Sequence, residues 1–538
     1  MPATSPLKSE YDVIVVGAGA AGAAYISRLT AAGLNVLAIE RGPFYRDHYN
    51  DFYESELAVF NLLWDNNNYG VSGKAFRGTP NLGRAVGGGT LAWTAVALRF
   101  FERDFTFASR WGRIPGSNVA DWPIRLHHLR RYYSEAEIHM GVSGAPTVWD
   151  APGTPPPPNP PLPLYRGSRL CRDAFERLNM NWAPGRIAVN SQPYNGNGAC
   201  LNCGHCRAGC RINAKYQADK VLIEPALATG YLTLAYESVV TRLRTSECGR
   251  RVCGVTFADT VSGEYRDVDA RFVVVCNNPI ETPRLLLASA NDAHPGGLGN
   301  RYDQVGRNFF CHLGTIGYGI TEQDLRNSIG HNMGNIMSLD TCENTDNGDY
   351  AGGFTLMSLQ GAGAGVVALD PLVAVNGERL KEKMAAYNNS ILMVSFVEGL
   401  PVADNRITLL LAQCDEFGVP KAHVHYDYHD NDIRALGHAQ ARMRQVLQAA
   451  GSSETFVSPE FESHPMGSMR MGRDPHVSAT DPWGRVHGIP NLYIGGASLF
   501  ASGSSVNPTL TLHALALRSA DHLVRASLCS EPFTEAVA

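Results

Sequence analysis

Apolar and polar residues follow a recognisable order near the start of the chain. An apolar run from Tyr11 to Val16 leads into a glycine-rich turn, a stretch of helical character and a second apolar run that ends at Glu40. Short apolar runs bounded by turn residues are typical of buried parallel strands, and the stretch between them is long enough for a helix. The pattern therefore predicts one strand–helix–strand unit.

Strand-like patterns return in three later parts of the chain. The segments 231–244 and 250–259 predict strands within the region 215–310. Between 311 and 460, the segments 351–359, 388–400 and 406–412 are predicted to form an antiparallel sheet over which a substrate binds. From 491 onward, a strand, a turn of small residues and a helix beginning near Pro508 complete an α/β pattern without an internal repeat.

The first glycine turn reads GAGAAG, which is the spacing of a dinucleotide-binding motif. Gly17 would allow a tight turn, Gly19 would let the backbone approach a pyrophosphate, and Gly22 would permit close packing of helix on strand. Glu40, at the end of the second strand, could accept hydrogen bonds from ribose hydroxyls. The motif predicts a dinucleotide site but does not separate FAD from NAD.

Two further turns of small residues favour FAD. Residues 84–99, RAVGGGTLAWTAVALR, form a second glycine-rich turn against which another part of a long cofactor could lie. A third turn precedes the helix expected near Pro508, whose N-terminus could face the electron-rich side of a flavin ring. Three separated turns fit FAD, because its adenine and isoalloxazine ends lie far apart.

Five segments, in the same order over nearly the whole chain, resemble the successive signatures of one enzyme family. They are GAGAAG with Glu40, the RAVGGGT turn, FVVVCNNPIETPRLLLAS at 272–289, HPMGSMRMG at 464–472, and RVHGIPNLYIGGAS continuing to SVNPTLTLHALALRSADHL. As a set they resemble the glucose-methanol-choline (GMC) oxidoreductases. The resemblance implies an α/β fold of the p-hydroxybenzoate hydroxylase type, with a Rossmann-type FAD-binding domain and a substrate domain on an antiparallel sheet. It also implies oxidation of a CH–OH group by hydride transfer to FAD.

The patterns and the resemblance together predict three regions. Residues 1–140, 215–310 and 461–538 would form a discontinuous FAD-binding domain, 311–460 the substrate-binding domain, and 141–214 a Pro-rich and Cys-rich insertion. The proline stretch at 151–163 is interpreted as a surface spacer rather than a polyproline ligand for another protein, because it lies within the catalytic chain. The residues expected to contact FAD are Gly17, Gly19, Gly22, Glu40, Arg84, Gly87, Gly88, Thr90, Trp93, Val240, Ala497, Asn507, Pro508 and Thr509.

Two residues are the candidates for the chemistry. His464 matches the family's catalytic histidine, and an imidazole titrates near neutral pH, which suits a general base. Asn507 matches a second active-site position that holds histidine or asparagine in the family; its amide could orient the substrate oxygen, or it could simply cap the following helix. His487 and His513 are interpreted as packing or surface residues.

Three positions depart from the family pattern. Trp93 replaces a common asparagine, which resembles the pyranose oxidase and bacterial glucose dehydrogenase branch. Ala92 stands where pyranose oxidases attach flavin to a histidine, so noncovalent FAD is expected. Gly496 replaces a common aspartate, so no carboxylate role is assigned there.

Four of the 12 cysteines form a compact motif, C-x2-C-x2-C-x3-C, at Cys200, Cys203, Cys206 and Cys210. This spacing is close to that of ferredoxins, although Arg211 replaces the usual proline, and it favours an iron–sulfur cluster (3Fe-4S or 4Fe-4S). Zinc, free thiols and disulfides are the alternatives. The segment also resembles the cysteine-rich segment of bacterial FAD glucose dehydrogenases, which pass electrons onward from a cluster.

Charge and hydropathy restrict the partners. The net charge of −5 offers no electrostatic footprint for nucleic acid, and no apolar stretch is long enough to span a membrane. Without a signal-like N-terminus, a cytoplasmic location is the default expectation, although export with a partner subunit would leave no mark in the sequence.

The sequence therefore predicts FAD-dependent oxidation of a hydroxyl of a sugar, glycoside or aminosugar, with electrons relayed through the cluster to an external acceptor. A small subunit or an electron-acceptor protein would be a natural partner. The alternative is an oxidase that reduces dioxygen to hydrogen peroxide, with structural cysteines. A noncatalytic FAD-binding or electron-transfer subunit is disfavoured, because His464 and Asn507 are both present.

Overall fold

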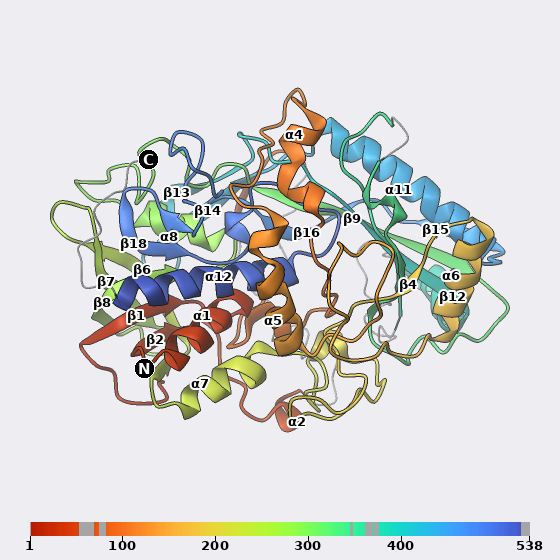
Figure 1. The fold of residues 1–538 in the computed structure, drawn as a ribbon, viewed down its shortest axis with the longest axis horizontal. Coiled ribbons are helices and arrows are strands. Elements are labelled where there is room, and N and C mark those ends of the chain that lie inside the picture. The colour runs from red at the N-terminus through yellow and green to blue at the C-terminus, as the bar shows by residue number, and fades with distance from the viewer. Residues whose placement is uncertain are drawn as a thin grey trace.

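Two large β-sheets, each built from separate stretches of chain, form the frame of the protein (Figure 1). The computed structural model describes residues 2–52, 69–74, 82–344, 348–360, 368 and 376–528. The first sheet has eight strands, and its central strands β1, β2 and β8 run parallel. Its strands are β1 (Glu10–Val16), β2 (Val36–Ile39), β5 (Leu232–Ala235), β6 (Ser238–Thr245), β7 (Val252–Asp259), β8 (Tyr265–Val275), β17 (Arg485–Val486) and β18 (Ile489–Ile494).

The strand–helix–strand unit predicted from the first apolar runs is confirmed. The helix between β1 and β2 is α1 (Ala20–Ala31), and Glu40 follows β2 directly. The valines at the ends of β1 and β8 are buried, as expected for central strands with both faces covered. The helix expected near Pro508 is α12 (Thr509–Leu528), and it packs against α1 beside the sheet (Figure 1).

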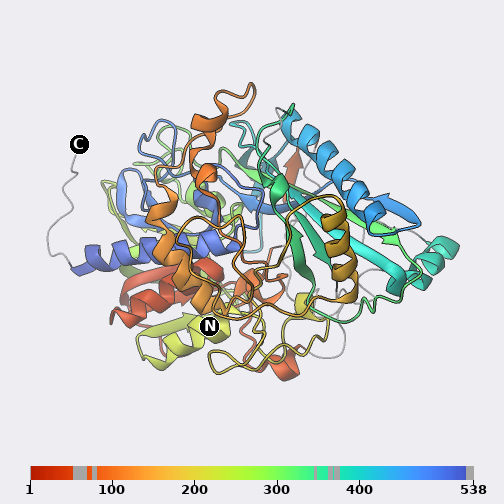
Figure 2. The same ribbon diagram turned by 45° about the vertical axis from the view of Figure 1, so that its right-hand side comes forward.

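The second sheet has seven strands and is antiparallel along its main path. Its strands are β4 (Ala183–Pro184), β9 (Phe310–Ile320), β10 (Met333–Ser338), β11 (Leu356–Leu359), β12 (Ser390–Val397), β15 (Glu454–Val457) and β16 (Phe461–Met466). Helices α6 (Arg166–Arg177) and α11 (Asp430–Ala449) contact this sheet, and Figure 2 shows α11 along its outer side. Gly317 permits that approach, because a Cβ there would lie 2.3 Å from the Met443 sulfur.

One predicted strand is present but belongs to a different sheet from the one expected. The segment 406–412, expected in the large antiparallel sheet, belongs to a separate three-stranded sheet of β13 (Arg406–Cys414), β14 (Pro420–His425) and β3 (Gly70–Ser72). Strands β13 and β14 are joined by a short turn and pair as a hairpin. Such local pairing closes a far shorter loop than pairing with a distant sheet edge would, which explains the outcome.

The other helices are shorter and surround the two sheets. They are α2 (His48–Asp51), α4 (Phe107–Trp111), α5 (Arg130–Met140), α7 (Glu224–Ala228), α8 (Glu281–Ala288) and α10 (Gly377–Ala385). The proline stretch at 151–163 has neither helix nor an extended strand, as predicted. In the part of the chain that the structure describes, no helix is both long and apolar enough to cross a membrane.

Candidate active site

A cavity of about 920 Å³ is lined by residues of both large sheets and of the turns between them. This volume lies within the range of ligand sites in proteins, about 300–1,000 Å³. Most of the residues predicted to contact FAD line the cavity, and so does His464. They are Gly17, Gly19, Glu40, Arg84, Gly88, Thr90, Trp93, Val240, Ala497, Asn507, Pro508 and Thr509.

The two predicted residues that do not line the cavity support its wall. Gly22 lies in α1, where a Cβ would be 1.9 Å from the carbonyl oxygen of Gly17, so only glycine lets the helix pack this close to the turn. Gly87 has a left-handed φ of +96° and starts the second glycine turn. The packing role predicted for Gly22 is therefore confirmed, whereas contact of Gly22 or Gly87 with FAD stays a prediction.

The two glycine turns, predicted from separate motifs, touch one another. A Cβ on Gly88 would lie 2.8 Å from the Cα of Gly19. Gly17 has φ +92°, and a Cβ there would meet the Asn277 Oδ1 at 2.9 Å. Backbone of this kind leaves the cavity wall free of side chains, which is what a closely held pyrophosphate requires.

Glu40 fixes the first glycine turn as well as facing the cavity. Its Oε2 accepts a hydrogen bond from the backbone N–H of Ala18, and its Oε1 accepts one from Gly42, both at 2.9 Å. The carboxylate therefore anchors the backbone on both sides of β2. Its bond to a ribose hydroxyl stays a prediction.

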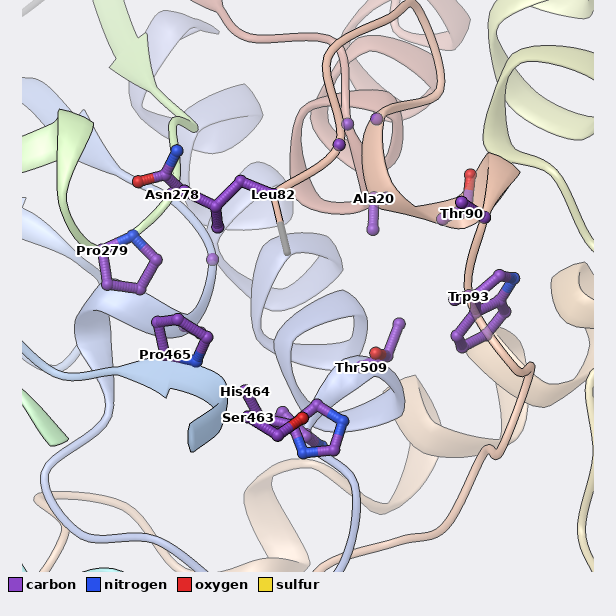
Figure 3. A pocket seen from close by; sticks show the side chains of 18 of the residues that line it. Ala20, Leu82, Thr90, Trp93, Asn278, Pro279, Ser463, His464, Pro465 and Thr509 are labelled. Atoms are coloured by element: carbon purple, nitrogen blue, oxygen red, sulfur yellow. The ribbon is translucent and has the colours of Figure 1, made fainter. Parts of the chain in front are cut away.

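The other wall of this region carries Thr90 and Trp93. The Thr90 hydroxyl donates to the carbonyl oxygen of Gly87 at 2.6 Å, and the Trp93 indole N–H donates to that of Tyr216 at 3.1 Å. Figure 3 shows both side chains on one side of the cavity, across from Asn278 and Pro279. These contacts hold the second turn in place.

His464 lies at the end of the cavity that faces the second sheet (Figure 3). The β16–β9 pairing shifts register between Ser463 and Met466, and His464 adopts a left-handed φ of +54° in this bulge. Bulges re-aim side chains beside active sites, and a non-glycine residue with such a φ is a strained feature typical of them. The side chain is half-buried, because it borders the cavity.

Each ring nitrogen of His464 has a polar neighbour. The Nδ1 lies 3.0 Å from the Nδ1 of His312, and the Nε2 lies 3.2 Å from the Asn507 Nδ2. Burial, and then the neighbouring His312, hold the pKa of His464 well below its usual range. The imidazole is therefore neutral at neutral pH, as a general base must be before it takes a proton.

Asn507 is buried and offers an unused acceptor. Its Oδ1 is buried and has no hydrogen-bond partner among the described residues, while its Nδ2 contacts His464. Two residues further on, α12 begins at Thr509, which Figure 3 shows beside His464. A buried amide oxygen without a partner is uncommon in native proteins and fits a site that awaits a ligand donor.

His312 was not found from the sequence. It stands in β9, inside an otherwise apolar stretch, and its side chain is fully buried. A polar residue in an apolar strand is a weak signal, since most buried histidines only pack. His513, by contrast, is buried in α12 and does not line the cavity, and neither does His487.

The residues present fit FAD. A wall of close glycine turns with the anchored Glu40 lies at one end of the cavity, and an orphaned amide oxygen with a neutral imidazole lies at the other. The N-terminus of α12, a helix of 20 residues, meets the cavity between them and carries a partial positive charge.

The structure does not show the metal cluster predicted from the four cysteines. Within the described ranges, which include all four, no three His, Cys, Asp or Glu side chains group so as to hold a metal ion. The thiols occupy different surroundings: Cys206 is buried, Cys203 is exposed, and the Sγ of Cys200 accepts a hydrogen bond from the Asn202 backbone N–H. The structure thus shows no ligand set formed by Cys200, Cys203, Cys206 and Cys210, and the iron–sulfur cluster stays a prediction.

The fold and the cavity define an FAD-type oxidoreductase architecture, with a Rossmann-like sheet facing an antiparallel sheet across the site. Two family models described as GMC oxidoreductase match residues 168–314 and 401–516. The chain belongs to this family, whose members bind FAD and act on CH–OH groups.

Relatives and solved structures agree with this assignment. The chain is 28% identical to 2-methyl-1,2-propanediol dehydrogenase of Mycolicibacterium austroafricanum, over 96% of this chain and 95% of the relative. It is 28% identical to the fructose dehydrogenase large subunit of Gluconobacter japonicus (95% and 97%) and 28% identical to paromamine 6'-oxidase of Streptomyces fradiae (95% and 90%). Pyridoxine 4-oxidase from Mesorbium loti has the same fold, with a TM-score of 0.65 at 17% identity over 95% of this chain and 98% of that chain.

Proposed function

We propose that this protein oxidises a hydroxyl-bearing carbon of a sugar, glycoside or aminosugar to a carbonyl. The observation that carries the proposal is the pair of His464 and Asn507 at one end of a cavity whose other end has the features of a dinucleotide site. FAD, when bound, supplies the hydride acceptor. Relatives whose names refer to fructose, gluconate and paromamine support the carbohydrate class.

The roles of the two residues follow from their atoms. The substrate oxygen would lie against both the His464 Nε2 and the Asn507 Nδ2, which are 3.2 Å apart. The Nε2 accepts the hydroxyl proton, and the amide N–H donates to the substrate oxygen and stabilises the negative charge that develops there. The carbinol hydrogen leaves with its electron pair, so that a carbonyl forms.

A second candidate substrate class is a compact branched alcohol or diol. The second sheet presents a largely apolar wall to the cavity, formed by Ile316, Tyr318, Met333, Leu359, Leu392, Val394, Phe396 and Phe461. Apolar walls favour substrates with alkyl groups beside the reacting carbon, because each buried CH₂ contributes about 0.8 kcal/mol. The relative named 2-methyl-1,2-propanediol dehydrogenase supports this class.

The electrons must then leave the flavin. Relay through an iron–sulfur cluster to an external acceptor would make the protein a dehydrogenase, with a small subunit or carrier protein as partner, and the fructose dehydrogenase relative supports a partner of this kind. The arrangement of the four thiols does not support the cluster, so we assign no step to it. Direct reaction with dioxygen is the alternative.

One experiment tests both the substrate class and the route by which the electrons leave. The purified holoenzyme is mixed anaerobically with D-fructose, D-gluconate, paromamine or 2-methyl-1,2-propanediol, and bleaching of the flavin bands is followed. Fastest bleaching by a carbohydrate would support the proposal; fastest bleaching by the diol would favour the second class, and no bleaching by any compound would contradict both. Iron content and peroxide formation in air, on the same sample, separate the routes of the electrons.

A further inference from the structure

His312 contacts His464 and the loop that leads to Asn507, without bordering the cavity. Its Nδ1 lies 3.0 Å from the Nδ1 of His464, and its Nε2 lies 2.6 Å from the carbonyl oxygen of Ser504. Ser504 belongs to the loop that carries Asn507 to the start of α12. One side chain on β9 is thus bonded to the base and to the loop that holds its partner.

If both imidazoles are neutral, their hydrogen bonds allow only one placement of the ring protons. The Ser504 carbonyl can only accept, so the Nε2 of His312 carries a proton. A neutral imidazole has one N–H, so the Nδ1 of His312 is a bare acceptor. The Nδ1 of His464, which faces it at hydrogen-bond distance, must then be the donor, and the Nε2 of His464 is left without a proton.

Burial favours the neutral form of both imidazoles over a charged form. His312 is fully buried, and desolvation lowers its pKa to about 4, although its hydrogen bond to Ser504 opposes the shift. The ring of Phe396, which packs against both histidines, adds an apolar neighbour with centroids 6.0 Å from His312 and 4.8 Å from His464. The two imidazoles are therefore both neutral, and the order of their protons is fixed.

We infer that His312 is a positioning residue for the reaction: it holds His464 in the tautomer whose Nε2 carries no proton and faces Asn507, and it ties His464 to the loop that carries Asn507. Without an acceptor at the Nδ1 of His464, the proton could shift to the Nε2, where it would prevent proton abstraction. When His464 takes the substrate proton, the same bond becomes charge-assisted and stabilises the imidazolium. The inference rests on the proposed role of His464.

The test compares two replacements of similar size. His312→Leu removes the acceptor and the donor, whereas His312→Asn retains an amide oxygen near the position of Nδ1 that can accept from His464. Anaerobic stopped-flow reduction of the flavin, with the best substrate of the panel above, gives the limiting rate and the apparent dissociation constant. We expect His312→Leu to lower the limiting rate by about 10- to 100-fold with little change in dissociation constant, a smaller loss than the about 10²- to 10⁴-fold contribution of the base itself. His312→Asn should regain most of the rate.

A second measurement needs no substrate. Long-range ¹H–¹⁵N spectra of ¹⁵N-histidine-labelled holoenzyme show which ring nitrogen of each histidine carries the proton, and His464→Ala and His312→Leu identify the two signals. We expect a proton on the Nδ1 of His464 and on the Nε2 of His312. A proton on the Nε2 of His464 would overturn the inference, even if neither variant were stable enough for kinetics.

The outcomes distinguish this inference from the proposed function. If His464→Ala reduces its flavin as fast as wild type, the proposed base is wrong. If His464→Ala is slow but His312→Leu is not, the base stands and only the role of His312 fails. Equal loss of rate in His312→Leu and His312→Asn would also contradict the inference, because it would show that the acceptor atom is not what matters.

Discussion

The two ends of the cavity are built in different ways. At the end predicted to bind the nucleotide, backbone forms the wall. The turns of Gly17 and Gly88 contact each other, and Glu40 accepts a hydrogen bond from Ala18, only 22 residues away in the chain. At the end proposed for the chemistry, side chains form the site. His464 contacts His312, 152 residues away in the chain, and Asn507, 43 residues away. The first end is defined by conformations that only glycine adopts easily, the second by the order of protons in a buried network.

This difference implies that mutations at the two ends should impair different properties. A side chain added at the nucleotide end obstructs the cavity wall and should reduce FAD binding while leaving the chemistry intact. A side chain removed at the chemical end should slow the chemistry while leaving FAD in place. Variants at each end therefore test whether cofactor binding and chemistry are separable.

The largest effect is expected from His464→Ala. Without the Nε2 acceptor the hydroxyl proton has no base, so flavin reduction should slow by about 10²- to 10⁴-fold, the usual contribution of a general base. The FAD content should match that of wild type, because the glycine turns and Glu40 are untouched. Stopped-flow bleaching and the flavin-to-protein absorbance ratio measure the two quantities.

His513→Ala is a control for this variant, since it removes the buried imidazole of a histidine that does not line the cavity. It should leave the rate of flavin reduction near that of wild type. Loss of FAD from His464→Ala would contradict the separation of the two roles, because it would show that His464 also supports the cofactor.

A smaller effect, of the opposite kind, is expected from Gly17→Ala. The new Cβ would lie 2.9 Å from the Asn277 Oδ1 and 3.0 Å from the Cys276 carbonyl oxygen, at a φ of +92°. Strain of about 1–3 kcal/mol at such a position corresponds to FAD binding weakened by about 5- to 150-fold. Titration of the apoprotein with FAD measures it, and the reduction rate at saturating FAD should be unchanged.

Gly437→Ala serves as the control here. Gly437 lies in α11, where a Cβ would meet nothing within 4 Å, so the substitution should leave FAD affinity as it is. If Gly17→Ala bound FAD normally but reduced it slowly, the proposed division of labour between the ends would be wrong.

The nucleotide end could be predicted from the sequence because its contacts are local. Spacing along the chain determines the turn, the helix start and the acid at the strand end, and all three lie where the motif placed them. The large antiparallel sheet was predicted in outline, but β13 pairs with its own hairpin partner β14 instead. The domain boundaries remain a prediction.

The chemical end could be predicted only in part. His464 and Asn507 were found through the family resemblance, whereas His312 was missed, because its position depends on the β9–β16 register that pairs it with Ser463. A pattern of apolar and polar positions does not state which strands will pair. The cysteine motif is a different case: its spacing suits a cluster, but no metal-holding group is found among the described residues, so the cluster stays a prediction.

The smallest expected effect concerns Lys215, which joins the cysteine segment to the second glycine turn. Its buried Nζ donates to the carbonyl oxygens of Leu91, Trp93 and Cys206, at 2.7, 3.3 and 2.6 Å. Burial lowers its pKa to about 8, although Cys206 and Cys210 oppose the shift. Lys215→Met would leave these carbonyls without their donor, and an unsatisfied buried group costs about 1–3 kcal/mol, so the free energy of unfolding should fall.

The dependence of this loss on pH gives a sharper test. Because an unfolded lysine has a pKa of about 10.4, the unfolded state binds more protons than the folded state between about pH 8 and 10.4, so the contribution of Lys215 to stability rises with pH there, by at most about 1.4 kcal/mol per pH unit. The difference in unfolding free energy between wild type and Lys215→Met, measured by urea denaturation with saturating FAD, should therefore grow from pH 8 to pH 10. Lys381→Met, at a site 78% exposed, should show no such trend. A difference that stays flat or shrinks would mean that the ammonium is not held as a buried charge, and that the turn at Trp93 stands without the support of the cysteine segment.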